Sequence, residues 1–216
     1  MDRLLREAVQ AGSVEGIIAA VKRGADVNAR DDGGETALTY ATSVGLGPER
    51  AAGCVRCLLR LGARVSEEGP QSRLTTSVHG AAENGYTEAL KELLSADGKV
   101  AVNKFDDISR TPLMYAVENA HLAGASLLLE AGADVDANDS EMIGNTALIT
   151  AVQARNPSMV RLLLSYGADP TIPGWMQLTA LDRASDWAVE GAAPELREIF
   201  ELLDNEAKRR KPIAPE

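Results

Sequence analysis

Cysteine and histidine are the residue types in this chain best suited to metal or redox chemistry. Cys54 and Cys57 form a Cys-x-x-Cys pair, and the two histidines are His79 and His121. A structural zinc site needs four ligands, and a reactive thiol needs surroundings that lower its pKa. Two cysteines are also too few for a disulfide framework in a chain of 216 residues. We therefore expect no metal site, no cofactor and no disulfide-stabilised fold.

Carboxylates are numerous, but they recur singly along the chain. Asp31, Asp106 and Glu141 each stand five residues before a threonine, at the start of similar turn-like segments. General acid–base catalysis by paired carboxylates needs two such groups held at one site. The sequence also shows no nucleophile–base pattern and no phosphate-binding glycine fingerprint. These patterns predict that the protein is not an enzyme.

The run Lys208-Arg209-Arg210-Lys211 is the strongest cluster of positive charge. Such a run is typical of a localisation signal or of a contact for an acidic partner. The simpler interpretation is a solvated helix end, where cations offset the helix dipole, followed by a tail that contains Pro212 and Pro215. The sequence favours the simpler interpretation.

Composition and charge narrow the class of protein. Hydrophobic residues make up 45% of the chain and charged residues 25%, as in ordinary globular domains, while aromatic residues at 4% leave an aliphatic core. The net charge is −10, and residues 110–207 alone carry fifteen acidic and five basic side chains. Such a chain suits neither nucleic acids nor anionic membrane surfaces, so we expect electrostatic steering to come from its C-terminal half.

The chain contains no apolar run of the roughly 18 residues that a membrane-spanning helix needs. Its first residues, Met1 to Glu7, include no apolar signal-peptide segment. We therefore expect a soluble, cytoplasmic protein.

Internal repetition indicates the architecture that positions these side chains. A phrase of the form Thr-x-Leu-x-x-Ala recurs with spacings of 33 to 40 residues, and a Gly-Ala-Asp-Val phrase keeps step with it. Threonine is a good helix N-cap, and glycine is the favoured residue where a helix ends in a left-handed conformation. Each repeat therefore predicts two short helices that must stack on their neighbours. The threonines are Thr36, Thr76, Thr111, Thr146 and Thr179, and the glycines are Gly24, Gly62, Gly132 and Gly167.

These phrases resemble the ankyrin repeat, whose signature is Thr-Pro-Leu-His-x-Ala, over nearly the whole chain. The resemblance implies an all-α solenoid of about six helix-turn-helix units with atypical units at both ends, forming a single domain over residues 1–207, followed by a basic tail over 208–216. The spacing of 40 residues between Thr36 and Thr76 implies about seven extra residues, most simply in Val44–Ala52 between two helices. The expected units are 1–33, 34–73, 74–108, 109–143, 144–176 and 177–207.

The positions of the cysteines and histidines within the repeat also indicate structural roles for them. Counted back from Gly62, Cys54 and Cys57 fall where a later unit has Met159 and Leu162, so both are predicted to be buried core residues. The resemblance places His79 at the signature histidine, which in this family bonds neighbouring backbone. His121 is expected at the start of a second helix.

In ankyrin-like units, the turn tips and the exposed face of the first helix line a concave groove that binds partner proteins. Positions there are free of the repeat signature, and aromatic, methionine and arginine side chains among them are favoured interface anchors. Trp187 could equally shield the core of the last repeat. The predicted binding residues are Tyr40, Asp107, Ile108, Arg110, Tyr115, Glu118, Asn119, Met142, Ile143, Asn145, Trp175, Met176, Arg183, Asp186 and Trp187.

The sequence thus predicts a non-catalytic protein–protein interaction module that binds through this groove and is monomeric on its own. Its acidity and its apolar anchors favour a partner with a basic, partly apolar surface. One alternative is a regulatory or inhibitory protein, such as a toxin-neutralising partner that masks a basic active site. A less favoured alternative is an enzyme built on a repeat scaffold.

Overall fold

The computed structural model describes residues 2–65, 76–138, 144–185 and 193–210. Every regular element within these ranges is a helix, as the sequence predicts. The chain divides into two compact units, Met1–Ala133 and Asp134–Glu216, which are described in turn.

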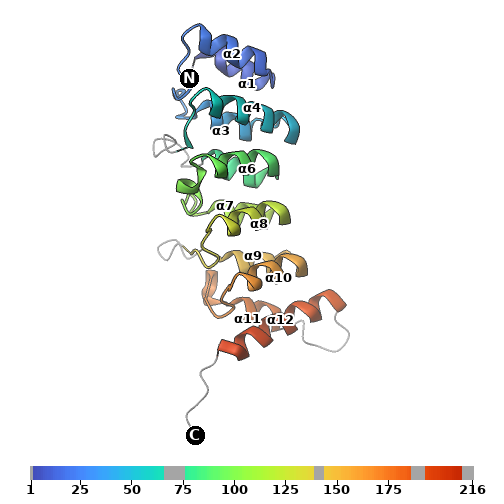
Figure 1. Ribbon diagram of the computed structural model, residues 1–216. Helices are drawn as coiled ribbons and strands as arrows, with labels where there is room; N and C mark the ends of the chain where they lie inside the picture. The colour runs from blue at the N-terminus through green and yellow to red at the C-terminus, as the bar shows by residue number, and fades with distance from the viewer. Residues whose placement is uncertain (1, 66–75, 139–143, 186–192, 211–216) are drawn as a thin grey trace. The chain divides into compact units, whose positions relative to one another are not determined.

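The first unit is a stack of four helix pairs, which Figure 1 shows one above another. The first helices of successive pairs pack on one another, as do the second helices α2, α4, α6 and α8. The pairs are α1 (Arg3–Gln10) with α2 (Val14–Lys22), α3 (Ala37–Ser43) with α4 (Pro48–Arg60), α5 (Ser77–Glu83) with α6 (Thr87–Ser95), and α7 (Pro112–Glu118) with α8 (Leu122–Glu130). A short 3-10 helix, η2 (Gly98–Ala101), follows α6.

The second unit contains two further pairs. Helix α9 (Ala147–Gln153) packs on α10 (Pro157–Ser165), and α11 (Ala180–Ala184) packs on α12 (Pro194–Arg210). A 3-10 turn, η3 (Trp175–Gln177), precedes α11. Helix α12 continues through Lys208, Arg209 and Arg210, so most of the basic run belongs to a helix end, in agreement with the simpler interpretation.

Threonine caps set the start of the first helices. The Oγ1 of Thr36 accepts the backbone N–H of Thr39 at 3.2 Å, and Thr146 accepts that of Ile149 at 3.2 Å. Pro112 occupies the first turn of α7, where no helical partner for its missing N–H is needed. The local signals read from the sequence therefore place these helix starts correctly.

Glycines end the second helices as predicted. The φ angles of Gly24, Gly62, Gly132 and Gly167 lie between 86° and 99°, in the region that L-residues rarely adopt. A second class of positive φ occurs between the two helices of a pair, at Gly12, Gly45, Gly85, Ala120 and Arg155. The core between the helices is aliphatic, with fully buried Leu, Ile, Val and Ala side chains from both helices of each pair.

The predicted insertion between α3 and α4 is only partly correct. Helix α4 has 13 residues, whereas α2, α6, α8 and α10 have nine each. Most of the extra residues therefore extend the second helix at its start and do not form a loop. Pro48 at the first helical position accounts for this, because its fixed φ favours a helix start.

Candidate protein-binding surface

Turn tips before the first helices are built on one pattern. In the tip 31–35, Asp31 N–H donates to the carbonyl of Glu35 at 3.0 Å, and Asp31 Oδ1 accepts the N–H of Gly33 and of Glu35 at 3.0 and 2.9 Å. Asp106 repeats these bonds in the tip 106–110. Asp31 and Asp106 thus hold these two turns, while Glu141, the third acidic residue at this repeat position, lies outside the described residues.

A third tip, 174–178 in the second unit, keeps the backbone pattern without an aspartate. Gly174 N–H donates to Leu178 carbonyl at 3.0 Å. A Cβ at Gly174 would lie 2.6 Å from Asn145 Oδ1 and 2.7 Å from Ile149 Cδ1, so a larger residue would require these side chains to move. Asn145, which lies shortly before α9, accepts the N–H of Trp175 at 3.1 Å. A side-chain amide from outside this tip thus anchors a turn that elsewhere is anchored by its own aspartate.

This third tip presents large apolar side chains to solvent. Trp175 is 59% exposed and Met176 is 64% exposed. Met176 and Gln177 have φ angles of 63° and 58°, which is unfavourable for residues with a Cβ. Arg183 on α11 donates to the carbonyl of Trp175 at 3.1 Å and holds the turn from its other side. Strained backbone that is fixed by its surroundings and exposes apolar side chains is typical of binding sites.

In the first unit, the tip 106–110 carries Ile108, which is 55% exposed. Its neighbour Asp107 is exposed, and no hydrogen bond or ion pair of its side chain is found among the described residues. Ile108 is thus an apolar side chain next to a free carboxylate.

The tyrosines of the first helices are held by arginines. The Arg110 guanidinium lies 5.6 Å from the ring centre of Tyr115 and pairs with Glu118, while Tyr115 Oη donates to Asp106 Oδ2 at 2.7 Å. Burial and this hydrogen bond raise the pKa of the Tyr115 hydroxyl. One face of the ring is therefore covered within the chain, so Tyr115 positions the turn more than it offers apolar surface.

Tyr40 repeats this arrangement with an arginine from another helix. The Arg6 guanidinium lies 4.8 Å from the ring centre of Tyr40, and Arg6 also pairs with Asp31 at 3.1 Å. Because α1 supplies this arginine, the contact joins the first helix pair to the tip 31–35.

The predicted binding residues thus fall into three clusters and a set outside the described residues. Arg110, Tyr115 and Glu118 form one cluster beside Asp107 and Ile108, with Asn119 capping the end of α7 through a bond to the Tyr115 carbonyl. A second cluster consists of Asn145, Trp175, Met176 and Arg183, and Tyr40 forms a third with Arg6. Met142, Ile143, Asp186 and Trp187 lie outside the described residues.

Sequence reasoning missed the supporting roles of Arg6 and Asn145. Arg6 lies 34 positions before Tyr40, and no local pattern signals that contact. The replacement of an aspartate by Gly174 was a usable signal, because it leaves the third tip in need of another acceptor.

The two cysteines and His79 have structural roles. Cys54 and Cys57 are buried free thiols, as predicted, and burial raises the pKa of Cys54 to about 11. His79 bonds Thr76 through Nδ1 and lies 3.1 Å from the Lys104 carbonyl and 3.2 Å from that of Arg110 through Nε2. Among the described residues, no group of three His, Cys, Asp or Glu side chains is arranged to hold a metal ion.

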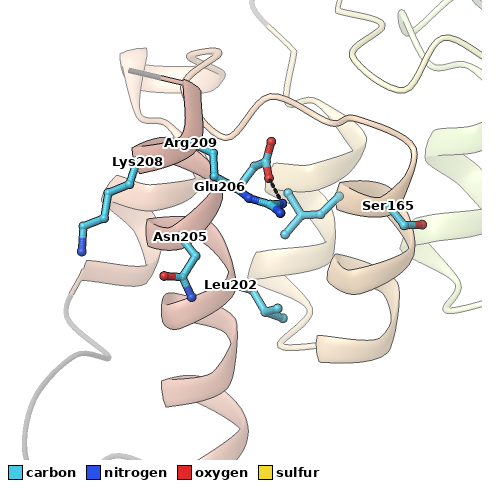
Figure 2. A pocket seen from close by; sticks show the side chains of 7 residues that line it. Ser165, Leu202, Asn205, Glu206, Lys208 and Arg209 are labelled. Atoms are coloured by element: carbon cyan, nitrogen blue, oxygen red, sulfur yellow. Dashed lines mark hydrogen bonds and ion pairs between the residues drawn. The ribbon is translucent and has the colours of Figure 1, made fainter. Parts of the chain in front are cut away.

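A surface pocket of about 720 Å³ lies between α10 and α12 (Figure 2). Several of its polar side chains already have partners within the chain. Glu206 pairs with Arg209 and Arg210, and the Ser165 hydroxyl donates to the Leu162 carbonyl at 2.6 Å. The pocket therefore offers no activated nucleophile. None of the described helices combines the length and the apolar character that crossing a bilayer requires.

Family models agree with the repeat register. The model for ankyrin repeats in three copies matches residues 49–139 and 78–174, which together span more than half of the chain. The chain belongs to the ankyrin repeat family. The matched region contains the tip 106–110 and ends at Gly174, the first residue of the tip 174–178.

Solved structures of other ankyrin repeat domains have the same fold. The ankyrin repeat domain of Bcl-3, a member of the IkappaB family, is 26% identical, with a TM-score of 0.76 over 95% of this chain and 86% of that one. The ankyrin repeat protein EF0377 is also 26% identical, with a TM-score of 0.76 over 93% and 96% of the two chains. A domain from Acinetobacter baumannii AYE, at 24% identity, shares the fold with a TM-score of 0.76 over 94% and 96%. No match was found among curated protein sequences.

Proposed function

We propose that this ankyrin repeat protein is a non-catalytic recognition module that binds a partner protein through its turn tips and first helices. Ankyrin repeats generally serve protein–protein interaction, so the fold supports this class of function. The observation that carries the proposal is the tip 174–178, where Trp175 and Met176 are exposed on a turn locked by Asn145 and Arg183. A preorganised apolar tip lowers the entropic cost of binding.

The partner surface is basic and partly apolar. In the first unit, Asp32 and Asp107 lie in the tips and are exposed, and their side chains make no ion pair among the described residues. The arginines nearby, Arg6 and Arg110, are already paired with Asp31 and Glu118. The uncompensated charge of these tips is therefore negative, which favours cationic side chains beside apolar ones on the partner.

Capture of partners from the native cell tests this proposal. The wild-type protein and a Trp175→Ala/Met176→Ala variant are immobilised, and bound proteins are identified by mass spectrometry. The proposal predicts at least one protein that the wild type retains and the variant loses, while both melt at similar temperatures. Equal recovery of every bound protein by both forms would reject the tip as a binding element.

A further inference from the structure

The second helices of the first unit carry a surface that the proposed function does not use. Helices α2, α4 and α6 lie side by side (Figure 1), and their C-terminal ends meet at one edge. Five exposed cations lie near these ends, and we call this set the basic stripe. Its members are Lys22, Arg23, Arg60, Lys91 and Lys99. Three of them stand at the ends of α2 and α4, whereas α6 has no basic residue in its last turn and contributes one cation from its middle, with the fifth in η2 beyond it.

The charges of the basic stripe are uncompensated. None of its five side chains makes an ion pair with another described residue, although the whole chain carries a net charge of −10. Two nearby acids are already engaged, since Glu92 pairs with Arg56 at 2.7 Å and Glu130 accepts the Ser126 hydroxyl at 3.1 Å. Glu88 lies three residues before Lys91 on α6 and makes no ion pair among the described residues. Offsetting of helix dipoles accounts for a cation at each helix end. It does not account for five unpaired cations along one edge.

Two surface pockets lie among these cations, and each is lined in part by apolar side chains. A pocket of about 300 Å³ between α2 and α4 is lined by Val14, Ile18 and Leu61, with Arg56 and Arg60 at its rim. A second pocket, of about 440 Å³ between α6 and α8, is lined by Leu94 and Leu127, with two cations, Lys91 and Lys99, and one carboxylate, Glu130, beside them. The edge therefore offers positive charge together with places for apolar side chains.

We propose that the basic stripe binds an acidic segment of another protein that also carries apolar side chains. Charge complementarity selects the acidic residues, and the two pockets accept the apolar ones. A nucleic acid fits less well, because no aromatic side chain among the described stripe and pocket residues is available for stacking on bases. The tips and the stripe of the first unit are thus assigned partners of opposite charge.

The test measures binding of a labelled amphipathic peptide of glutamate and leucine by fluorescence anisotropy at low salt. The stripe variant is Lys22→Gln/Arg60→Gln/Lys91→Gln/Lys99→Gln. The matched control, Arg3→Gln/Arg197→Gln/Lys208→Gln/Arg209→Gln, changes the net charge equally at exposed sites. Thermal unfolding verifies that both variants are folded. Inorganic polyphosphate and phosphatidylserine vesicles serve as anionic probes without peptide.

The proposal predicts that the wild type and the control bind the peptide alike, while affinity of the stripe variant falls about tenfold. It also predicts weaker binding to polyphosphate and to the vesicles than to the peptide. Absence of peptide binding, an equal loss in both variants, or tighter binding of either other probe would overturn it. The Trp175→Ala/Met176→Ala protein should bind this peptide normally, so this result is independent of the proposed function.

Discussion

Asn145 Oδ1 accepts the backbone N–H of Trp175 at 3.1 Å, and the two residues precede the successive first helices α9 and α11. A Cβ at residue 174 would lie 2.6 Å from the same oxygen, so a side chain there would require Asn145 to move. In the tips 31–35 and 106–110, an aspartate of the tip itself accepts the N–H groups of the second and fourth residues after it. An asparagine before α9 thus helps to fix how the next tip presents an exposed tryptophan.

We expect a glycine at position 120 to stabilise the protein, because Ala120 has a positive φ. Ala120 has a φ of 57° at a position where Gly12, Gly45 and Gly85 stand in other repeats. Ala120→Gly removes the Cβ strain and should raise the free energy of unfolding by about 0.5–1 kcal/mol, as measured by urea denaturation. The control Ala131→Gly, at a residue with a φ of −79°, should lower it instead. Destabilisation by Ala120→Gly would contradict the left-handed assignment.

Gly132 tests the converse substitution, in which a glycine at positive φ is replaced by a residue with a Cβ. It has a φ of 94°, and no atom lies within 4 Å of a Cβ built there, so space is available for a side chain. Gly132→Val should still lower the free energy of unfolding by about 1–3 kcal/mol, because a β-branched residue is strained at this φ. An unchanged melting temperature would show that backbone conformation does not limit this position.

We expect the thiols of the Cys-x-x-Cys pair to react slowly with thiol reagents, because both are buried. Cys54 is fully buried, and burial raises its pKa to about 11, so little thiolate forms at pH 8. Labelling of Cys54 by a thiol reagent should be slow in the native protein and fast in urea. Cys54→Ser should cost about 1–3 kcal/mol, whereas Cys57→Ser should cost less, because Cys57 is 8% exposed and Cys54 is fully buried. Rapid native labelling of Cys54 would contradict its burial.

His79 makes stability depend on pH. Burial lowers the pKa of His79 below 6.5, although Asp106 acts in the opposite direction. As pH falls below 6.5, the unfolded chain binds a proton at this histidine before the folded chain does, so stability is lost. The stability difference between wild type and His79→Ala should therefore be larger at pH 7.5 than at pH 5.5. A difference that grows on acidification would show that the folded state favours the charged ring.

Local rules made most of the fold predictable from sequence. Thr36 and Thr146 mark helix starts and Gly132 marks a helix end because capping depends on the residue and its immediate neighbours. The longer helix α4 was not foreseen, although Pro48 at its first position is a start signal. A repeat of unusual length is ambiguous, because extra residues fit a loop or a helix equally well in the sequence.

Tertiary contacts account for what the sequence did not reveal of the candidate surface. The Arg6 guanidinium covers part of the Tyr40 ring, so a residue expected to be an apolar anchor is partly occupied. The basic stripe was detectable, since Lys22 and Arg60 each stand two residues before a cap glycine. Only the packing of α2 on α4 shows that the two charges share an edge.

The central claim is that exposed tip side chains anchor a partner protein. The most direct measurement is the dissociation constant of a captured partner for wild type, Trp175→Ala and a matched control, Tyr166→Ala. Tyr166 is also an aromatic residue of the second unit, 41% exposed, but lies at the end of a second helix. We predict that Trp175→Ala weakens binding by about 2 kcal/mol or more and that Tyr166→Ala leaves it unchanged. Normal binding by Trp175→Ala together with a loss in Tyr166→Ala would contradict the account.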